Sequence, residues 1–107
     1  MKRNLGLIIL LIFSAPALAH HSDAGIDVQS IVELQGTVTE FRWRNPHVYI
    51  TVTSNDEHGK EVEWKVQAGA VAVMSRMGWS RDSIAVGDEV TIDVHPAKNG
   101  RPYGTVE

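Results

Sequence analysis

The chain has 107 residues, no cysteine, and 13 acidic side chains against 10 basic ones. The lack of cysteine excludes disulfide bridges and thiolate metal sites, which leaves histidine, carboxylate and methionine side chains as metal ligands. The net charge of −3 argues against a general nucleic-acid-binding protein, because such proteins present an excess of positive charge to the phosphate backbone.

The first 19 residues have the pattern of a signal peptide. Lys2 and Arg3 form a basic start, residues 5–13 are apolar, and Ala17 and Ala19 stand at the two small-residue positions that a signal peptidase reads. The apolar run is shorter than the roughly 20 residues that a transmembrane helix needs. We therefore expect cleavage after Ala19, a periplasmic or secreted location, and no membrane span in the mature protein.

The mature part is expected to consist of an N-terminal arm, residues 20–30, and one β domain, residues 31–107. The first strand is predicted over residues 31–44. Its apolar side chains share one face up to Val38 and use the opposite face from Phe41 onward. This change of phase near Thr39 indicates a bulge or a sharp coil, and long bent first strands are typical of small barrels.

Two further strands follow the break at Asn45-Pro46. Residues 48–53 and 61–67 alternate between apolar and polar side chains, and Gly59 lies in the hairpin connection between them. From Ala70 the apolar period becomes helical, with Met74 and Met77 on the inner face of the helix and Gly78 just past its end. A connector over residues 79–88 leads to a fourth strand at 90–95. A hairpin loop at 96–102 then precedes a fifth strand at 103–107.

The order of these elements is strand, strand, strand, short helix, strand, strand. With a bent first strand, this order predicts an all-β domain with one short helix, built as an OB-like five-stranded Greek-key barrel. The alternative architecture is an open antiparallel sheet with the helix packed on one face.

Short motifs occur in a fixed order along residues 19–107. They are Ala19-His20-His21-Ser22, Leu34-Gln35-Gly36-Thr37-Val38, Asn45-Pro46-His47, Gly78-Trp79-Ser80-Arg81-Asp82-Ser83, Gly87-Asp88-Glu89-Val90 and Pro96-Ala97-Lys98-Asn99-Gly100. In this order the chain resembles an uncharacterised family of small exported bacterial proteins. The resemblance implies export and a small β-rich domain, and it supplies no activity. Relatives usually continue beyond residue 107, which predicts a short fifth strand.

Histidines form the first candidate site, for a copper ion. Cleavage after Ala19 would place a free amine and an imidazole on His20, and a second ring from His47 or His95 would complete three nitrogen donors. Such a set resembles the histidine brace of copper-resistance carriers and lytic polysaccharide monooxygenases, and Cu²⁺ suits nitrogen donors. In an OB-fold the connections that carry His47 and His95 flank the ligand face.

Two alternatives to this copper site stay open. Cleavage after Ala17 would make His20 the third residue, and a third-position histidine binds Cu²⁺ with backbone nitrogens and needs no partner on the barrel. In the simpler alternative, the histidines are polar residues after a signal and His47 caps a turn.

Aromatic side chains form the second candidate site. Trp43 and Tyr49 are predicted on the face opposite the valines, where they would form a stacking platform for a sugar or a base. The alternative is that both rings belong to the core and its rim.

We therefore predict an exported, non-catalytic binding protein that holds Cu²⁺ through His20. The competing prediction is an OB-like interaction module for a small glycan or a protein partner. An oxidative enzyme built on the same three nitrogens ranks last, because the 88 mature residues leave little surface for a substrate. Ser80 and Ser83 have no predicted base beside them, so hydrolase chemistry is not indicated.

Overall fold

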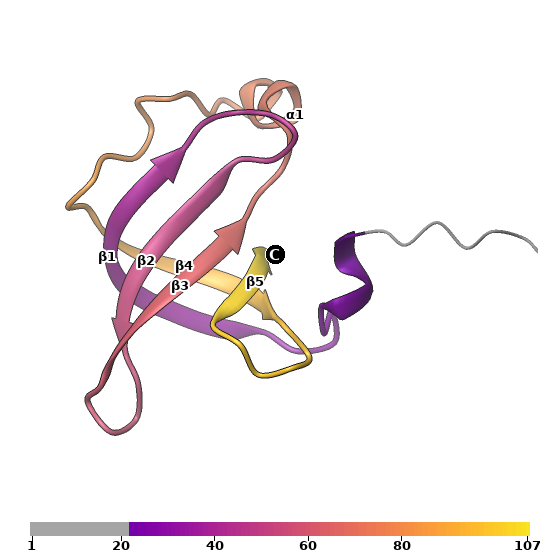
Figure 1. Cartoon of the computed structure of the whole chain (residues 1–107). Coiled ribbons are helices and arrows are strands. Elements are labelled where there is room, and N and C mark those ends of the chain that lie inside the picture. Colours follow the sequence, from indigo (N-terminus) through magenta and orange to yellow (C-terminus); the bar gives the residue numbers. More distant parts are fainter. Residues whose placement is uncertain (1–21) are drawn as a thin grey trace, which may run out of the picture.

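The computed structural model describes residues 22–107. Within these residues, five strands form a closed barrel in the order β1-β2-β3-β5-β4, with one short α-helix (Figure 1). The strands are β1 (Val32–Arg42), β2 (Tyr49–Asn55), β3 (Glu61–Gln67), β4 (Glu89–Pro96) and β5 (Tyr103–Val106). The helices are the 3₁₀-helix η1 (Ser22–Gly25) and α1 (Val71–Arg76). The predicted signal peptide and His20 lie outside the described residues.

The strand pairing confirms the predicted fold class. Neighbouring strands run antiparallel except β3 and β5, which are parallel, and β1 pairs with both β2 and β4. This is the connectivity expected of an OB-like Greek-key barrel. The short fifth strand pairs on both sides and closes the sheet, so the open-sheet alternative does not apply.

The predicted change of phase in β1 is confirmed as a bulge at Thr39. Val38 lies opposite Val52, whereas Glu40 lies opposite Thr51, so Thr39 is the extra residue on β1. Before the bulge the inner face carries the fully buried Val38. After it, Phe41 packs against the core. Because of the bulge, Val38 before it and Phe41 after it both point toward the core, although they are an odd number of residues apart.

The core consists of aliphatic side chains that alternate along the strands. Its buried members are Leu34, Val38, Ile50, Val52, Val66 and Val94. The helix α1 lies at one end of the barrel and contributes one buried side chain, Met74 (Figure 1). The expectation that Met77 also faces inward was wrong, because the helix ends at Arg76 and the Met77 side chain is 68% exposed.

The N-terminal arm is ordered along the loop that joins β4 and β5. Ile26 is buried and forms an isolated β-bridge with Ala97. The Asp27 N–H donates to the Pro96 carbonyl at 2.8 Å, and the Lys98 N–H donates to the Gly25 carbonyl at 2.8 Å. These contacts hold the arm at the end of the barrel where β1 begins, as Figure 1 shows for η1.

Asp27 organises the turn that leads from the arm into β1. The Ser30 hydroxyl donates to its Oδ2 at 2.7 Å, and the Gln29 N–H donates to its Oδ1 at 3.1 Å. These bonds, the Ser30 hydroxyl foremost, lower the pKa of Asp27 below its usual value. The stability that these bonds add to the folded protein is therefore fully present above the usual pKa of an aspartate. It is lost as the pH falls through the lowered pKa of Asp27.

Gly36 permits the close contact between β1 and β2. A Cβ atom at this position would overlap the Thr53 carbonyl oxygen and lie 2.8 Å from Cγ1 of Val52. The carbonyl belongs to the backbone of the neighbouring strand, so it cannot move aside without disturbing the ladder.

We expect Gly36→Ala to lower the free energy of unfolding by about 1–3 kcal/mol, the usual cost of overpacking. Urea denaturation followed by tryptophan fluorescence measures this loss. Gly25→Ala is the matched control, because a Cβ at Gly25 meets no atom within 4 Å. Equal stability of the two variants would contradict the role assigned to Gly36.

Candidate functional site

A groove opens beside β4, beyond the point where its pairing with β5 ends. β5 pairs with β4 at Val94, His95 and Pro96, and the Glu107 N–H adds one bond to the Asp93 carbonyl at 3.0 Å. Residues 89–92 of β4 have no strand on this side in the described chain. A cavity of about 860 Å³, which we call the α1–β4 groove, is bounded by α1, the following connector and β4. Its apolar lining includes Met74, Met77, Trp79, Ile84, Val90 and Ile92.

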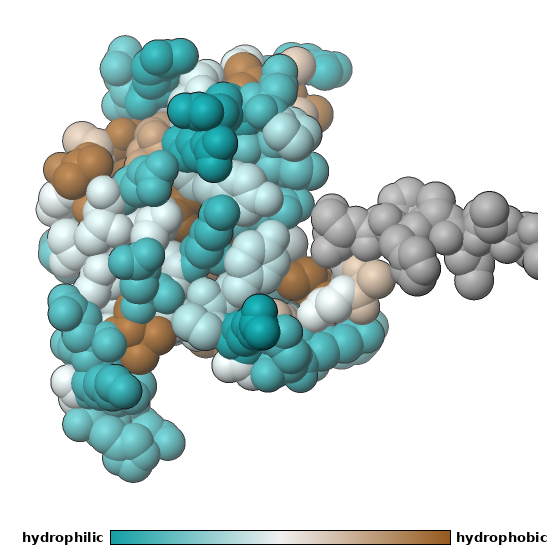
Figure 2. All heavy atoms as spheres, in the orientation of Figure 1, coloured by the Kyte–Doolittle hydropathy of each residue, from teal (hydrophilic) through white to brown (hydrophobic). Residues whose placement is uncertain are grey.

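The exposed apolar side chains of the protein gather in this groove. Among the described residues, eight large hydrophobic side chains are exposed, and five of them line the groove. The five are Val28, Val73, Met77, Trp79 and Val106. By contrast, the face in Figure 2 is mainly hydrophilic, with hydrophobic residues in small separate groups. Single exposed apolar side chains are common on protein surfaces, whereas a contiguous apolar patch marks a binding surface.

The short helix explains why these side chains stay accessible. Gly78, with φ of +92°, follows the helix, and the Trp79 N–H donates to the Met74 carbonyl at 3.0 Å. This reversal is a common way to end a helix. It leaves Met77 and Trp79 beside the groove instead of under a further helical turn.

His47 supplies a polar group to the groove. Its side chain lines the groove, and its Nδ1 atom is buried without a hydrogen-bond partner. The segment is held in place because the Val71 N–H donates to Asn45 Oδ1 at 3.1 Å and the Val48 N–H donates to the Gly69 carbonyl at 2.9 Å. A buried nitrogen without a partner costs about 1–3 kcal/mol.

His95 lies elsewhere, on the side of β4 that meets the N-terminal arm. Its Nδ1 is 2.9 Å from the Ser30 carbonyl oxygen. A carbonyl only accepts hydrogen bonds, so Nδ1 carries the proton, and the Nε2 atom of the neutral ring keeps its lone pair. The two candidate histidines therefore have different surroundings. Within residues 24–107, where side chains are described, no three histidine or carboxylate groups are close enough to hold a metal.

The two candidate aromatic residues also make separate contacts. The Trp43 ring packs on Phe41 with centroids 5.9 Å apart, and Phe41 belongs to the core side of β1. Tyr49 on β2 lies opposite Arg42, which is the residue after Phe41 on β1. Lys65 Nζ lies 4.4 Å from the Tyr49 ring centroid. Trp43 follows the end of β1. The contacts described for the two rings therefore involve different neighbours, Phe41 for Trp43 and Lys65 for Tyr49.

A hydrogen-bonded cluster fixes Tyr49 on the outer face. Its hydroxyl donates to Gln67 Oε1 at 3.1 Å, and the Tyr103 hydroxyl donates to the same oxygen at 2.9 Å. Gln67 is only 6% exposed, which is uncommon for a side chain on the outer face of a sheet. The cluster links β2, β3 and β5, so its evident role is to join the strands that close the barrel.

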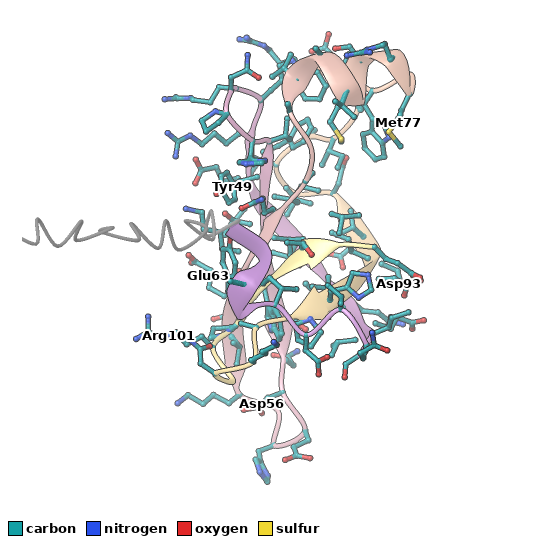
Figure 3. The ribbon with its side chains drawn as sticks, turned by 90° about the vertical axis from the view of Figure 1, so that its right-hand side faces the viewer. Tyr49, Asp56, Glu63, Met77, Asp93 and Arg101 are labelled. Carbon is teal, nitrogen blue, oxygen red and sulfur yellow. The ribbon has the colours of Figure 1, made fainter. Side chains whose placement is uncertain are left out.

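Sequence reasoning did not find the groove. One clue was present in the sequence. The apolar residues Trp79 and Ile84 both lie in the connector after α1, a segment predicted as a loop. Figure 3 shows that Met77 and Asp93, far apart in the sequence, lie on the same side of the molecule. In the described part of the chain no helix is long and apolar enough to cross a membrane.

Comparisons with known proteins give the family alone. No curated protein and no solved structure shows a significant match to the chain. The sequence profile of a family of unknown function, DUF6152, matches residues 9–106. This match spans nearly the whole chain and confirms the predicted membership in an uncharacterised family. The protein therefore belongs to the family of unknown function DUF6152.

Proposed function

We propose that this protein is an exported, non-catalytic binding module whose α1–β4 groove receives apolar groups of a ligand or partner. The observation that carries the proposal is the gathering of five of the eight exposed large hydrophobic side chains in one groove. Export is supported by the basic, apolar and small-residue order of residues 1–19.

The physical basis is the burial of apolar surface. Covering a fully exposed Val, Met or similar side chain is worth roughly 1.5–3 kcal/mol, and the groove offers several that are already partly sheltered. Ligand sites are typically apolar concavities with a few polar groups that set orientation. In this groove His47 is a polar residue of the lining.

The polar groups around the groove favour binding over catalysis. Ser83 lines the groove, but its hydroxyl oxygen accepts the Ser80 N–H at 2.8 Å. Among the described residues, no serine or threonine hydroxyl is hydrogen-bonded to a histidine ring. A nucleophile paired with a base is the arrangement that acyl-transfer chemistry requires.

We expect Met77→Gln to weaken the binding of the uncharged apolar fluorophore Nile red about fivefold, because it places an amide in the lining. Fluorescence titration of the mature protein measures the dissociation constant. Val86→Gln is the matched control, since Val86 is 70% exposed and lies outside the groove. Equal effects of the two substitutions would show that the dye binds elsewhere and would count against the groove.

A second candidate function is Cu²⁺ binding by a mature N-terminal His20 together with His95. It is favoured by the hydrogen bond between His95 Nδ1 and the Ser30 carbonyl. Metal-binding histidines usually donate their second ring nitrogen to a carbonyl or carboxylate in this way, which fixes the ring and frees the other nitrogen. The arm also docks beside Ala97, two residues from His95. These contacts favour His95 over His47 as the second imidazole.

We expect His95→Ala to weaken Cu²⁺ binding to the mature protein at least about tenfold, because one of three nitrogen donors is removed. Calorimetric titration measures the affinity, and the visible spectrum of the copper complex reports the number of nitrogen donors. His47→Ala and His58→Ala serve as controls and should bind like the unaltered protein. Retention of the same spectrum after acetylation of the terminal amine would exclude this site.

A further inference from the structure

Four exposed arginines lie at the end of the barrel that carries α1, which we call the α1 end. They are Arg42, Arg44, Arg76 and Arg81. The first two belong to the end of β1 and to the β1–β2 connection, and the other two belong to the end of α1 and to the connector after it. The Val71 N–H donates to Asn45 Oδ1 at 3.1 Å, which holds the β1–β2 connection beside the start of α1. Figure 1 shows this connection and the helix together at one end of the molecule.

The positive charge of the α1 end is largely uncompensated. Residues 42–48 and 70–84 carry the four arginines and one acidic residue, Asp82. Within residues 24–107, none of the four arginines forms an ion pair with a carboxylate. Glu40 lies two residues before Arg42 on β1 and is not paired with it. Because like charges repel one another, this arrangement favours a partner that brings negative charge to the α1 end.

Exposed apolar side chains lie at the same end of the molecule. Val73 on α1, Met77 at its C-cap and Trp79 just beyond it are all exposed. Tryptophan is enriched where proteins meet the interface between a membrane and water, because its ring is apolar and its N–H is polar. Apolar and basic side chains on one surface are also typical of segments that lie on a membrane. The α1 end therefore has both features of a surface that docks on lipid.

The opposite end of the barrel has the reverse charge. The β2–β3 hairpin carries Asp56, Glu57 and Glu61 against a single basic residue, Lys60. Figure 3 shows Asp56 at the end of the molecule away from Met77. An anionic surface would therefore orient the protein with the α1 end toward it and the hairpin away from it.

We propose that the α1 end docks on the surface of a bilayer that contains anionic phospholipids. The arginines would meet the headgroup phosphates, and Met77 and Trp79 would enter the interface. A soluble anionic polymer would engage the arginines alone, so the apolar side chains beside them favour a lipid surface. The inference rests on the proposed function in part, since Met77 and Trp79 line the groove, whereas the four arginines lie outside it.

The test measures binding of the mature protein to vesicles of phosphatidylcholine, with or without phosphatidylglycerol. The docking variant Arg44→Glu/Arg81→Glu reverses two charges at the α1 end, and neither side chain forms a hydrogen bond or an ion pair within the described chain. The matched control Lys60→Glu/Arg101→Glu makes the same change in net charge away from α1. Both of its residues are exposed.

We expect binding to vesicles with phosphatidylglycerol to be at least about tenfold tighter than to phosphatidylcholine alone, and high salt should remove this preference. The docking variant should bind the anionic vesicles at least about tenfold more weakly, and the control less than about threefold more weakly. Brominated acyl chains should quench the tryptophan fluorescence of the bound protein, and Trp79→Phe should remove most of this quenching. Co-sedimentation and fluorescence titration provide the measurements.

Equal weakening in the docking variant and the control would show that only net charge matters and would overturn the inference. Binding of dextran sulfate without binding of anionic vesicles would also overturn it and would favour a soluble anionic polymer.

Nile red separates this inference from the proposed function. The docking variant should bind the dye like the unaltered protein, because its substitutions lie outside the groove. If Nile red binds in the groove but anionic vesicles do not bind, docking on lipid is wrong and the groove remains a site. If the vesicles bind through the arginines but Met77→Gln leaves dye binding unchanged, the proposed function of the groove fails and the docking inference stands.

Discussion

The closure of the barrel by a four-residue strand is the constraint on which the rest of the structure depends. β5 pairs in parallel with β3 at residues 65–67 and antiparallel with β4 at residues 94–96. Gly104 lies at the centre of this contact, where a Cβ atom would overlap the His95 carbonyl oxygen and the Val94 side chain. In the described chain this strand pairs with only part of β3 and part of β4. The α1–β4 groove lies beside the remaining part of β4.

The groove is bounded by side chains from segments that are distant in the chain. Val90 and Ile92 come from β4, whereas Met77 and Trp79 come from the end of α1 and the connector. With six residues α1 buries Met74 alone, and Met77 and Trp79 stay exposed. The proposed function of the groove follows from this arrangement.

The N-terminal arm creates a separate set of contacts on the outer side of β4. Ile26 and Asp27 dock on the β4–β5 loop, and Ser30 orients the His95 ring. His47, by contrast, lines the groove near the start of α1. Copper binding by the arm and apolar binding by the groove therefore depend on different residues. Loss of one kind of binding would therefore leave the other unaffected.

Local patterns in the sequence were sufficient to predict the barrel. The strands are specified by the alternation of apolar and polar side chains. The turns are specified by the breaks at Asn45-Pro46 and Asn99-Gly100, and the bulge by the phase change near Thr39. Each of these patterns lies within a short stretch of the sequence. Strand order then follows, because few topologies accommodate a bent first strand and one helix between the third and fourth strands. The family was also recognised from motifs that are contiguous in the chain.

The groove was decided by tertiary structure, because it depends on which distant segments the fold brings together. Met77 and Trp79 belong to a helix end and a connector, whereas Val90 and Ile92 belong to β4, and no local period links these segments. The surroundings of Trp43 were likewise decided by the fold, since its ring packs on Phe41, which follows the bulge and packs against the core. The sequence by itself determined the elements and their order through local propensity and periodicity. Only the folded chain decided which apolar side chains were left uncovered, because burial depends on contacts between residues distant in the sequence.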